Sequence, residues 1–148
     1  MKILLVEDFE EKANNIIAFL NQVFPEYDID RCSSYNTAQE MIFEHSEDYK
    51  LILLDMSMST YDLNVDASGG LPEPAAGEYI LEGMFLRDIT TPVIVITMYN
   101  VFGRRELSAF DTELQAKYPQ NYKSYVFYSS QRTDWKNELK KQIKDLQL

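Results

Sequence analysis

Continuous apolar runs that end in an acidic or hydroxyl residue recur along the chain. Lys2 to Val6 runs directly into Glu7 and Asp8, and Leu51 to Leu54 runs into Asp55. Short runs of β-forming residues without polar alternation are typical of strands buried on both faces of a sheet. A weaker alternating run and two further apolar runs bring the number of predicted strands to five. The predicted strands are 2–6, 27–33, 51–54, 92–97 and 124–128.

Segments with helical spacing separate these strands. Apolar residues recur at helical intervals from Ala13 to Val23, and Pro25 ends the pattern. Thr37 and Glu40 have the spacing of a capping box, so the second helix is predicted to begin near Thr37. The other predicted helices are 79–87, 104–118 and a last one carrying the apolar residues 135, 139, 143 and 146.

Five strands alternating with five helices predict one architecture. Right-handed parallel crossovers place helices on both faces of a sheet, so we expect an α/β fold with a doubly wound, five-stranded parallel sheet. The 148 residues match one domain, 1–148. Ligands of such folds bind at the carboxyl ends of the strands, where Glu7, Asp8, Asp55 and Thr97 are expected.

A segment rich in glycine and proline, 59–77, interrupts the alternation. It predicts a long inserted loop, and long loops in compact domains are usually functional. The oxygen-bearing side chains of 62–73 follow the spacing of a calcium loop, but Ala67 stands where that loop needs glycine. A lid or partner-docking loop beside Asp55 is therefore the favoured interpretation.

Composition narrows the function. The formal net charge of -10 disfavours direct nucleic-acid binding, because phosphate backbones are repelled. The apolar runs are far shorter than the ~20 residues that cross a bilayer, so no membrane association is expected. Acidic residues at positions 7 and 8 argue against a signal peptide, and the lone Cys32 fits a cytoplasmic location.

Three acidic side chains are expected to converge. If Glu7, Asp8 and Asp55 project from neighbouring strand ends, two carboxylates ~4 Å apart repel by about 4 kcal/mol at an effective dielectric of ~20. A bound proton or a divalent cation has to offset this repulsion. An all-oxygen site suits Mg²⁺, which we favour, and a cation beside Asp55 would also shield an incoming phosphate.

The same segments resemble the receiver domain of two-component response regulators over nearly the whole chain, which implies a flavodoxin-like receiver fold. The similar motifs are Glu7-Asp8-Phe9 after the first strand, Asp55-Met-Ser57 after the third, and the strands ending at Thr97 and containing Tyr125. The resemblance implies that Asp55 accepts a phosphoryl group. It also implies that Glu7, Asp8, Asp55 and the backbone carbonyl of Ser57 hold Mg²⁺, and that Thr97 and Tyr125 form a switch pair.

The chain departs from the family pattern at several positions. The family places a lysine just past the fifth strand, where this chain has Tyr128. Arg132, in the following loop, is the candidate substitute for the phosphoryl contact, although a planar guanidinium is no simple replacement for an ammonium. Met98 fills a position that is usually small, and we expect it to narrow access to Asp55.

Two functions follow from these observations. The first is a stand-alone receiver domain, not an enzyme, that takes its phosphoryl group from a histidine kinase or phosphotransfer protein and signals to an unknown downstream protein. The second is a pseudo-receiver, an interaction module that works without phosphorylation. The missing lysine favours the second and the intact acid cluster the first. The sequence does not decide between a monomer and a homodimer.

Overall fold

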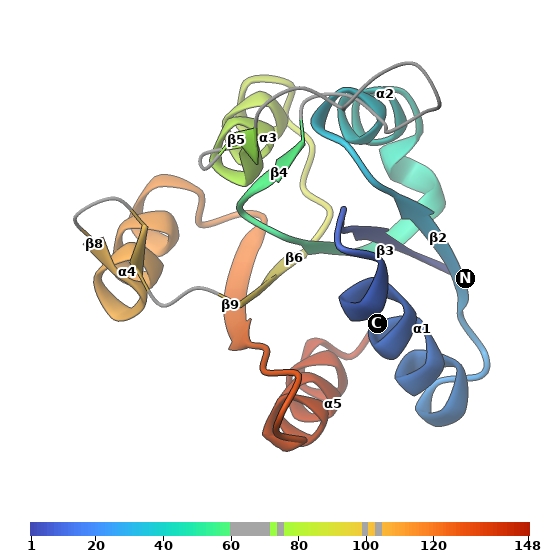
Figure 1. Ribbon diagram of the computed structural model, residues 1–148. Coiled ribbons are helices and arrows are strands. Elements are labelled where there is room, and N and C mark those ends of the chain that lie inside the picture. Colours follow the sequence, from blue (N-terminus) through green and yellow to red (C-terminus); the bar gives the residue numbers. More distant parts are fainter. Residues whose placement is uncertain (60–71, 74–75, 99–100, 103–104) are drawn as a thin grey trace, which may run out of the picture.

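The computed structural model describes residues 1–59, 72–73, 76–98, 101–102 and 105–148. Its centre is a five-stranded parallel sheet in the order β2-β1-β3-β6-β9 (Figure 1). The central strands are almost fully buried, and β2 at the edge is only half-buried. The predicted doubly wound α/β fold is confirmed. The strands are β1 (Lys2–Val6), β2 (Asp28–Cys32), β3 (Tyr49–Leu54), β6 (Val93–Thr97) and β9 (Tyr122–Phe127).

Helices cover both faces of this sheet. Two of them, α1 and α5, lie on one face, and α2, α3 and α4 lie on the other (Figure 1). None of the helices in the described ranges is both long and apolar enough to span a membrane. The helices are α1 (Glu10–Val23), α2 (Tyr35–His45), α3 (Ala76–Leu86), α4 (Leu107–Lys117) and α5 (Asp134–Leu146), and a 3₁₀ turn, η1 (Ser46–Asp48), follows α2.

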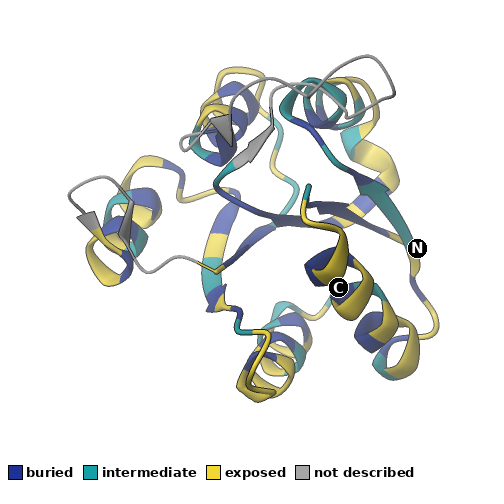
Figure 2. Ribbon diagram, in the orientation of Figure 1, coloured by how far each residue is buried: buried dark blue, intermediate teal, exposed yellow. Residues whose placement is uncertain are grey.

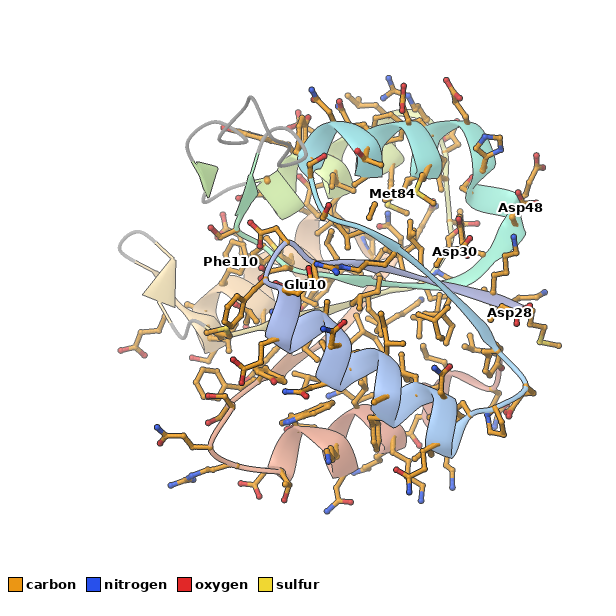
Figure 3. All side chains as sticks on the ribbon, turned by 45° about the vertical axis from the view of Figure 1, so that its right-hand side comes forward. Glu10, Asp28, Asp30, Asp48, Met84 and Phe110 are labelled. Atoms are coloured by element: carbon orange, nitrogen blue, oxygen red, sulfur yellow. The ribbon has the colours of Figure 1, made fainter. Side chains whose placement is uncertain are left out.

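Each face of the sheet has its own apolar core. On the α2–α4 side the core includes Met84 of α3 and Phe110 of α4, and on the other side Ile16 of α1 packs near Leu139 of α5. Figure 2 shows the buried sheet between helices whose outer faces are exposed. Figure 3 shows side chains filling both layers, with Met84 on the α2 side. The two cores hold the sheet rigid on both sides, so its strand ends are fixed points for a site.

The structure differs from the sequence-based prediction in the segment 59–77. Two short antiparallel strands pair there, β4 (Met58–Ser59), which begins one residue before the segment, and β5 (Pro72–Glu73), and α3 already begins at Ala76. Residues 60–71, which include most of the calcium-like spacing at 62–73, lie outside the described residues. A second short pair, β7 (Val101–Phe102) and β8 (Arg105–Glu106), precedes α4, so α4 begins at Leu107 and not at 104.

Two helix starts also differ. The predicted capping box at Thr37 is wrong: α2 begins at Tyr35, and the hydroxyl of Ser34 accepts a hydrogen bond from the backbone N–H of Thr37 at 3.2 Å. Ser34 is therefore the N-cap, which satisfies a backbone donor that the first turn leaves free. The first helix begins at Glu10, three residues before the apolar pattern, with two acidic residues in its first turn.

Candidate functional site

The register of the central strands brings the acidic residues together. In the sheet Val6 of β1 lies opposite Leu54 of β3, so Glu7 and Asp55 leave the sheet side by side. The backbone N–H of Asp55 donates to the carbonyl of Val6 at 3.0 Å, which continues the pairing past the strand. One carboxylate oxygen each of Glu7, Asp8 and Asp55 lies within 4.8 Å of the others. The pairing of β1 with β3 thus produces the predicted convergence of the three acids.

Backbone groups hold Asp55 in a defined pose. The residue is only 4% exposed, and its Oδ1 accepts a hydrogen bond from the backbone N–H of Met56 at 2.9 Å. Gly77, in the first turn of α3, packs directly behind it and donates its N–H to the Met56 carbonyl at 3.0 Å. A Cβ on Gly77 would stand 2.8 Å from the carbonyl oxygen of Asp55, so this close approach requires glycine.

Burial dominates the electrostatics of Asp55. The pKa of Asp55 is raised to about 8, chiefly by loss of solvation, with Lys12 lowering it and Glu7 and Asp8 adding to the rise. Burial likewise raises the pKa of Glu7, again against the attraction of Lys12. Without more positive charge, this group of acids therefore favours protonation over full ionisation.

Glu7 is buried as deeply as the core. It is 1% exposed, and its Oε1 accepts a hydrogen bond from the backbone N–H of Phe9 at 3.1 Å. Its Oε2 is buried with no well-aligned hydrogen-bond donor in the described part of the chain. The charge on this oxygen is met instead by an ammonium, the Nζ of Lys12, at 2.6 Å.

Lys12 is a site residue that the sequence-based interpretation missed. This side chain of α1 is 1% exposed. Its Nζ lies 2.6 Å from Oε2 of Glu7 and 3.5 Å from Oδ1 of Asp55, and it donates to the carbonyl of Ile96 at 2.8 Å. A buried lysine that touches two buried carboxylates is part of the same electrostatic unit.

The donor set fits a divalent cation. Three carboxylates and one ammonium, if all are ionised, carry two net negative charges, which a divalent ion balances. The three acids offer carboxylate oxygens, the ligand type that Mg²⁺ and Mn²⁺ take in proteins. Oε2 of Glu7 is a buried oxygen that accepts no hydrogen bond from the residues that the structure describes. Asp8 and Ser57 are partly exposed and so lie where an ion with its waters could enter.

The predicted switch residues end up on neighbouring strands. Thr97 ends β6, is fully buried and pairs in register with Phe127 of β9. Tyr125 lies opposite Val95, and its ring packs partly buried against the core on the α2–α4 side. Met98, the predicted access residue, is 37% exposed.

Tyr128 and Arg132 lie on the α1–α5 side. Tyr128 is 2% exposed, its hydroxyl accepts a hydrogen bond from Nδ2 of Asn15 at 2.9 Å, and its ring packs on Trp135. Arg132 is exposed and lines a cavity of about 240 Å³ together with Asn15, Tyr128 and Trp135. Its predicted phosphoryl contact stays a prediction.

Similar proteins identify the family. The chain is 34% identical over 151 residues to the Detocs response regulatory protein DtcB of Enterobacter cloacae, covering 99% of this chain and 100% of that one. This chain belongs to the response-regulator family. No model of a protein family matches it.

Solved receiver domains share the fold of this response regulator. The signal receiver domain of a LuxO-type repressor from Vibrio parahaemolyticus superposes with a TM-score of 0.64 at 21% identity, over 97% of this chain and 86% of that one. The Mn²⁺-bound form of the response regulator Rcp1 also gives 0.64, at 18% identity, over 95% of this chain and 89% of that one. The predicted family and receiver fold are confirmed.

Proposed function

We propose that this response regulator accepts a phosphoryl group on Asp55 from a histidine kinase or phosphotransfer protein and signals through protein–protein contacts. The convergence of Glu7, Asp8 and Asp55 at the carboxyl ends of β1 and β3 carries the proposal. Three buried or half-buried carboxylates lower stability unless a ligand balances their charge. At a phosphate-transfer site they would bind a metal ion and accept the phosphoryl group. The Enterobacter relative is named as a response regulatory protein, which fits a signalling role.

In the proposed step, an oxygen of Asp55 attacks the phosphorus of the donor. One P–O bond forms, the bond from phosphorus to the leaving group breaks, and the leaving group departs with the electron pair. The N–H of Met56 fixes the carboxylate for this attack, because it already holds Oδ1 at 2.9 Å. Glu7, Asp8, Asp55 and the Ser57 carbonyl are the ligands we propose for Mg²⁺. When bound, the ion supplies the charge that shields the carboxylate from the incoming phosphate.

We propose that the phosphoryl group is read through Thr97 and Tyr125. A phosphoryl group adds about -1.5 to -2 charges at this end of the sheet and brings strong acceptor oxygens. The hydroxyl of Thr97 is the nearby donor expected to turn toward it, and the ring of Tyr125 on the adjacent strand is expected to follow. The surface of α4 and β9 would then present the signal to a downstream protein or to a second copy.

The test is the intact mass of the protein after incubation with Mg²⁺ and acetyl phosphate. The native chain is expected to gain one phosphoryl group, with acetate leaving, and Asp55→Asn is expected to gain none. Equal modification of both proteins would place the acceptor elsewhere.

A second function, an interaction module that works without phosphorylation, is favoured by one observation. Tyr128 fills the position of the family lysine with a buried aromatic ring. If the native chain gains no mass under conditions that modify an ordinary receiver, this second function is the better description.

A further inference from the structure

Lys12, the lysine buried in α1, is not one of the motif residues on which the resemblance to receiver domains rests. Removing an ammonium from water costs several kcal/mol unless oxygens replace the lost hydration. Lys12 also lies in the first turn of α1, where the helix dipole disfavours positive charge. Both costs are offset by the three oxygens around its Nζ, on Glu7, Asp55 and the Ile96 carbonyl. The position of Lys12 is therefore tied to the acid cluster and not to the helix.

The three N–H bonds of the ammonium are not equally engaged. Nζ donates a hydrogen bond to the carbonyl of Ile96 at 2.8 Å. Its contact with Oε2 of Glu7, at 2.6 Å, is a close ion pair that is not aligned as a hydrogen bond. The contact to Oδ1 of Asp55 is 3.5 Å, which is longer than a good hydrogen bond. A lysine has three donors and one is used on the Ile96 carbonyl, so a donor is available for the Asp55 side.

Tyr128 stands beside this ammonium. Nζ of Lys12 lies 5.8 Å from the centre of the Tyr128 ring, within the range in which a ring face attracts a cation. Asn15, one turn along α1 from Lys12, donates to the Tyr128 hydroxyl. The position that carries a lysine in the family thus carries a ring that contacts a lysine from another element. A positive charge therefore lies beside position 128, and it comes from α1.

We propose that Lys12 is the phosphoryl-contacting cation of this receiver, delivered from α1. It pairs with Glu7 and Asp55 in the unphosphorylated protein and directs its remaining donor to an oxygen of the phosphoryl group during and after transfer. Ile96 anchors the ammonium during the change, because its carbonyl is held in the sheet. This inference rests on the proposed phosphorylation of Asp55 and adds the residue that compensates for the missing lysine.

The experiment follows phosphorylation rates by intact mass with Mg²⁺ and acetyl phosphate. Four proteins are compared with the native chain: Lys12→Met, Lys12→Gln, the double variant Lys12→Met/Tyr128→Lys, and Lys2→Met as a control. Lys12→Gln keeps a polar N–H donor at position 12 without the charge. Lys2 forms an exposed ion pair with Asp30 at 3.7 Å and has no part in the site. Circular dichroism at the assay temperature checks that each variant is folded.

Both single variants at position 12 are expected to react about 100-fold more slowly, the usual effect of losing one donor that stabilises developing charge. The double variant is expected to recover at least about ten-fold, because a lysine returns to the position it has in the family. The control is expected to react like the native chain. A merely structural role of Lys12 would leave the phosphorylation rate of folded Lys12→Gln close to that of the native chain.

Binding of Mg²⁺ alone supplies a readout independent of phosphorylation. Lys12→Gln removes a cation that competes for Glu7, so calorimetry is expected to show Mg²⁺ affinity raised by about ten-fold while the phosphorylation rate falls. Native rates in both single variants would overturn the role of Lys12 and leave the function of Asp55 intact. No modification of the native chain would overturn the proposed function and, with it, this inference.

Discussion

The stability of the metal-free protein is expected to depend on Lys12 more than on any surface lysine. The substitution Lys12→Met keeps an unbranched stem of similar length and removes the ammonium group, which leaves Glu7 and Asp55 buried without a cation. Removing one partner from a buried ion pair costs about 3 to 5 kcal/mol. For a chain of 148 residues, each kcal/mol lowers Tm by roughly 4 °C, so a fall of about 12 to 20 °C is expected.

The size of this loss should depend on pH and on metal. Protonated carboxyls need no ammonium, so the loss is expected to be larger at pH 8 than at pH 5. A divalent cation replaces the missing charge, so saturating Mg²⁺ should raise the Tm of Lys12→Met more than that of the native chain. At 100 times its dissociation constant, a ligand adds about 2.7 kcal/mol to the stability of any protein that binds it only when folded.

Thermal unfolding followed by far-UV circular dichroism in EDTA, and again in Mg²⁺, measures these effects. Lys2→Met is the matched control, because an exposed ion pair contributes about 0 to 1 kcal/mol. Adding Glu7→Gln to Lys12→Met should restore part of the loss, since a neutral amide needs no counter-charge. If Lys12→Met in EDTA were as stable as the control at pH 8, Lys12 would not be the charge that holds the acids together.

Three further predictions follow from single residues. Gly77→Ala should lower stability by about 1 to 3 kcal/mol and slow phosphorylation of Asp55, because the new Cβ would meet Met56 and the Asp55 carbonyl. Chemical denaturation measures the loss of stability, and intact mass measures the rate of phosphorylation. Because the pKa of Asp55 is raised to about 8, metal-free stability should fall from pH 4 to 8, and Asp55→Asn should flatten this slope in denaturation curves. Burial and a hydrogen bond to Asp111 raise the pKa of Tyr122. The stability that the neutral Tyr122 hydroxyl contributes should therefore be lost only as the pH rises above 10, and the alkaline unfolding of Tyr122→Phe should be less steep than that of the native chain.

The sheet could be predicted because its central strands appear in the sequence as continuous apolar runs. Runs such as Leu51–Leu54 are buried on both faces, so nothing in their pattern competes with a strand assignment. The acids at the ends of β1 and β3 follow directly, because parallel strands bring their carboxyl ends to one edge. Glu7, Asp8 and Asp55 were therefore predictable as a group from two runs and the parallel topology.

The short strands and the helix cap were missed because they leave no periodic pattern of apolar residues in the sequence. The short pairs β4–β5 and β7–β8 have two residues per strand, too few to show alternation. Three hydroxyl residues, Ser33, Ser34 and Thr37, stand near the start of α2, and the hydroxyl of Ser34 is the one that accepts from the backbone N–H of Thr37. The local sequence allows more than one of them to be the cap, and the path of the chain out of β2 decides which one is.

Lys12 was missed although its position in the sequence carries a signal. Ile16 and Leu20 follow it at intervals of four, and both are fully buried on the face of α1 that packs on the sheet. A lysine in line with such a stripe has to reach past it to solvent or to a buried anion. Lys12 lies at the end of α1 nearest Glu7 and Asp8, so the carboxylates are closer than solvent. A charged residue on an apolar stripe, one turn from a strand-end acid, should therefore be treated as a candidate site residue.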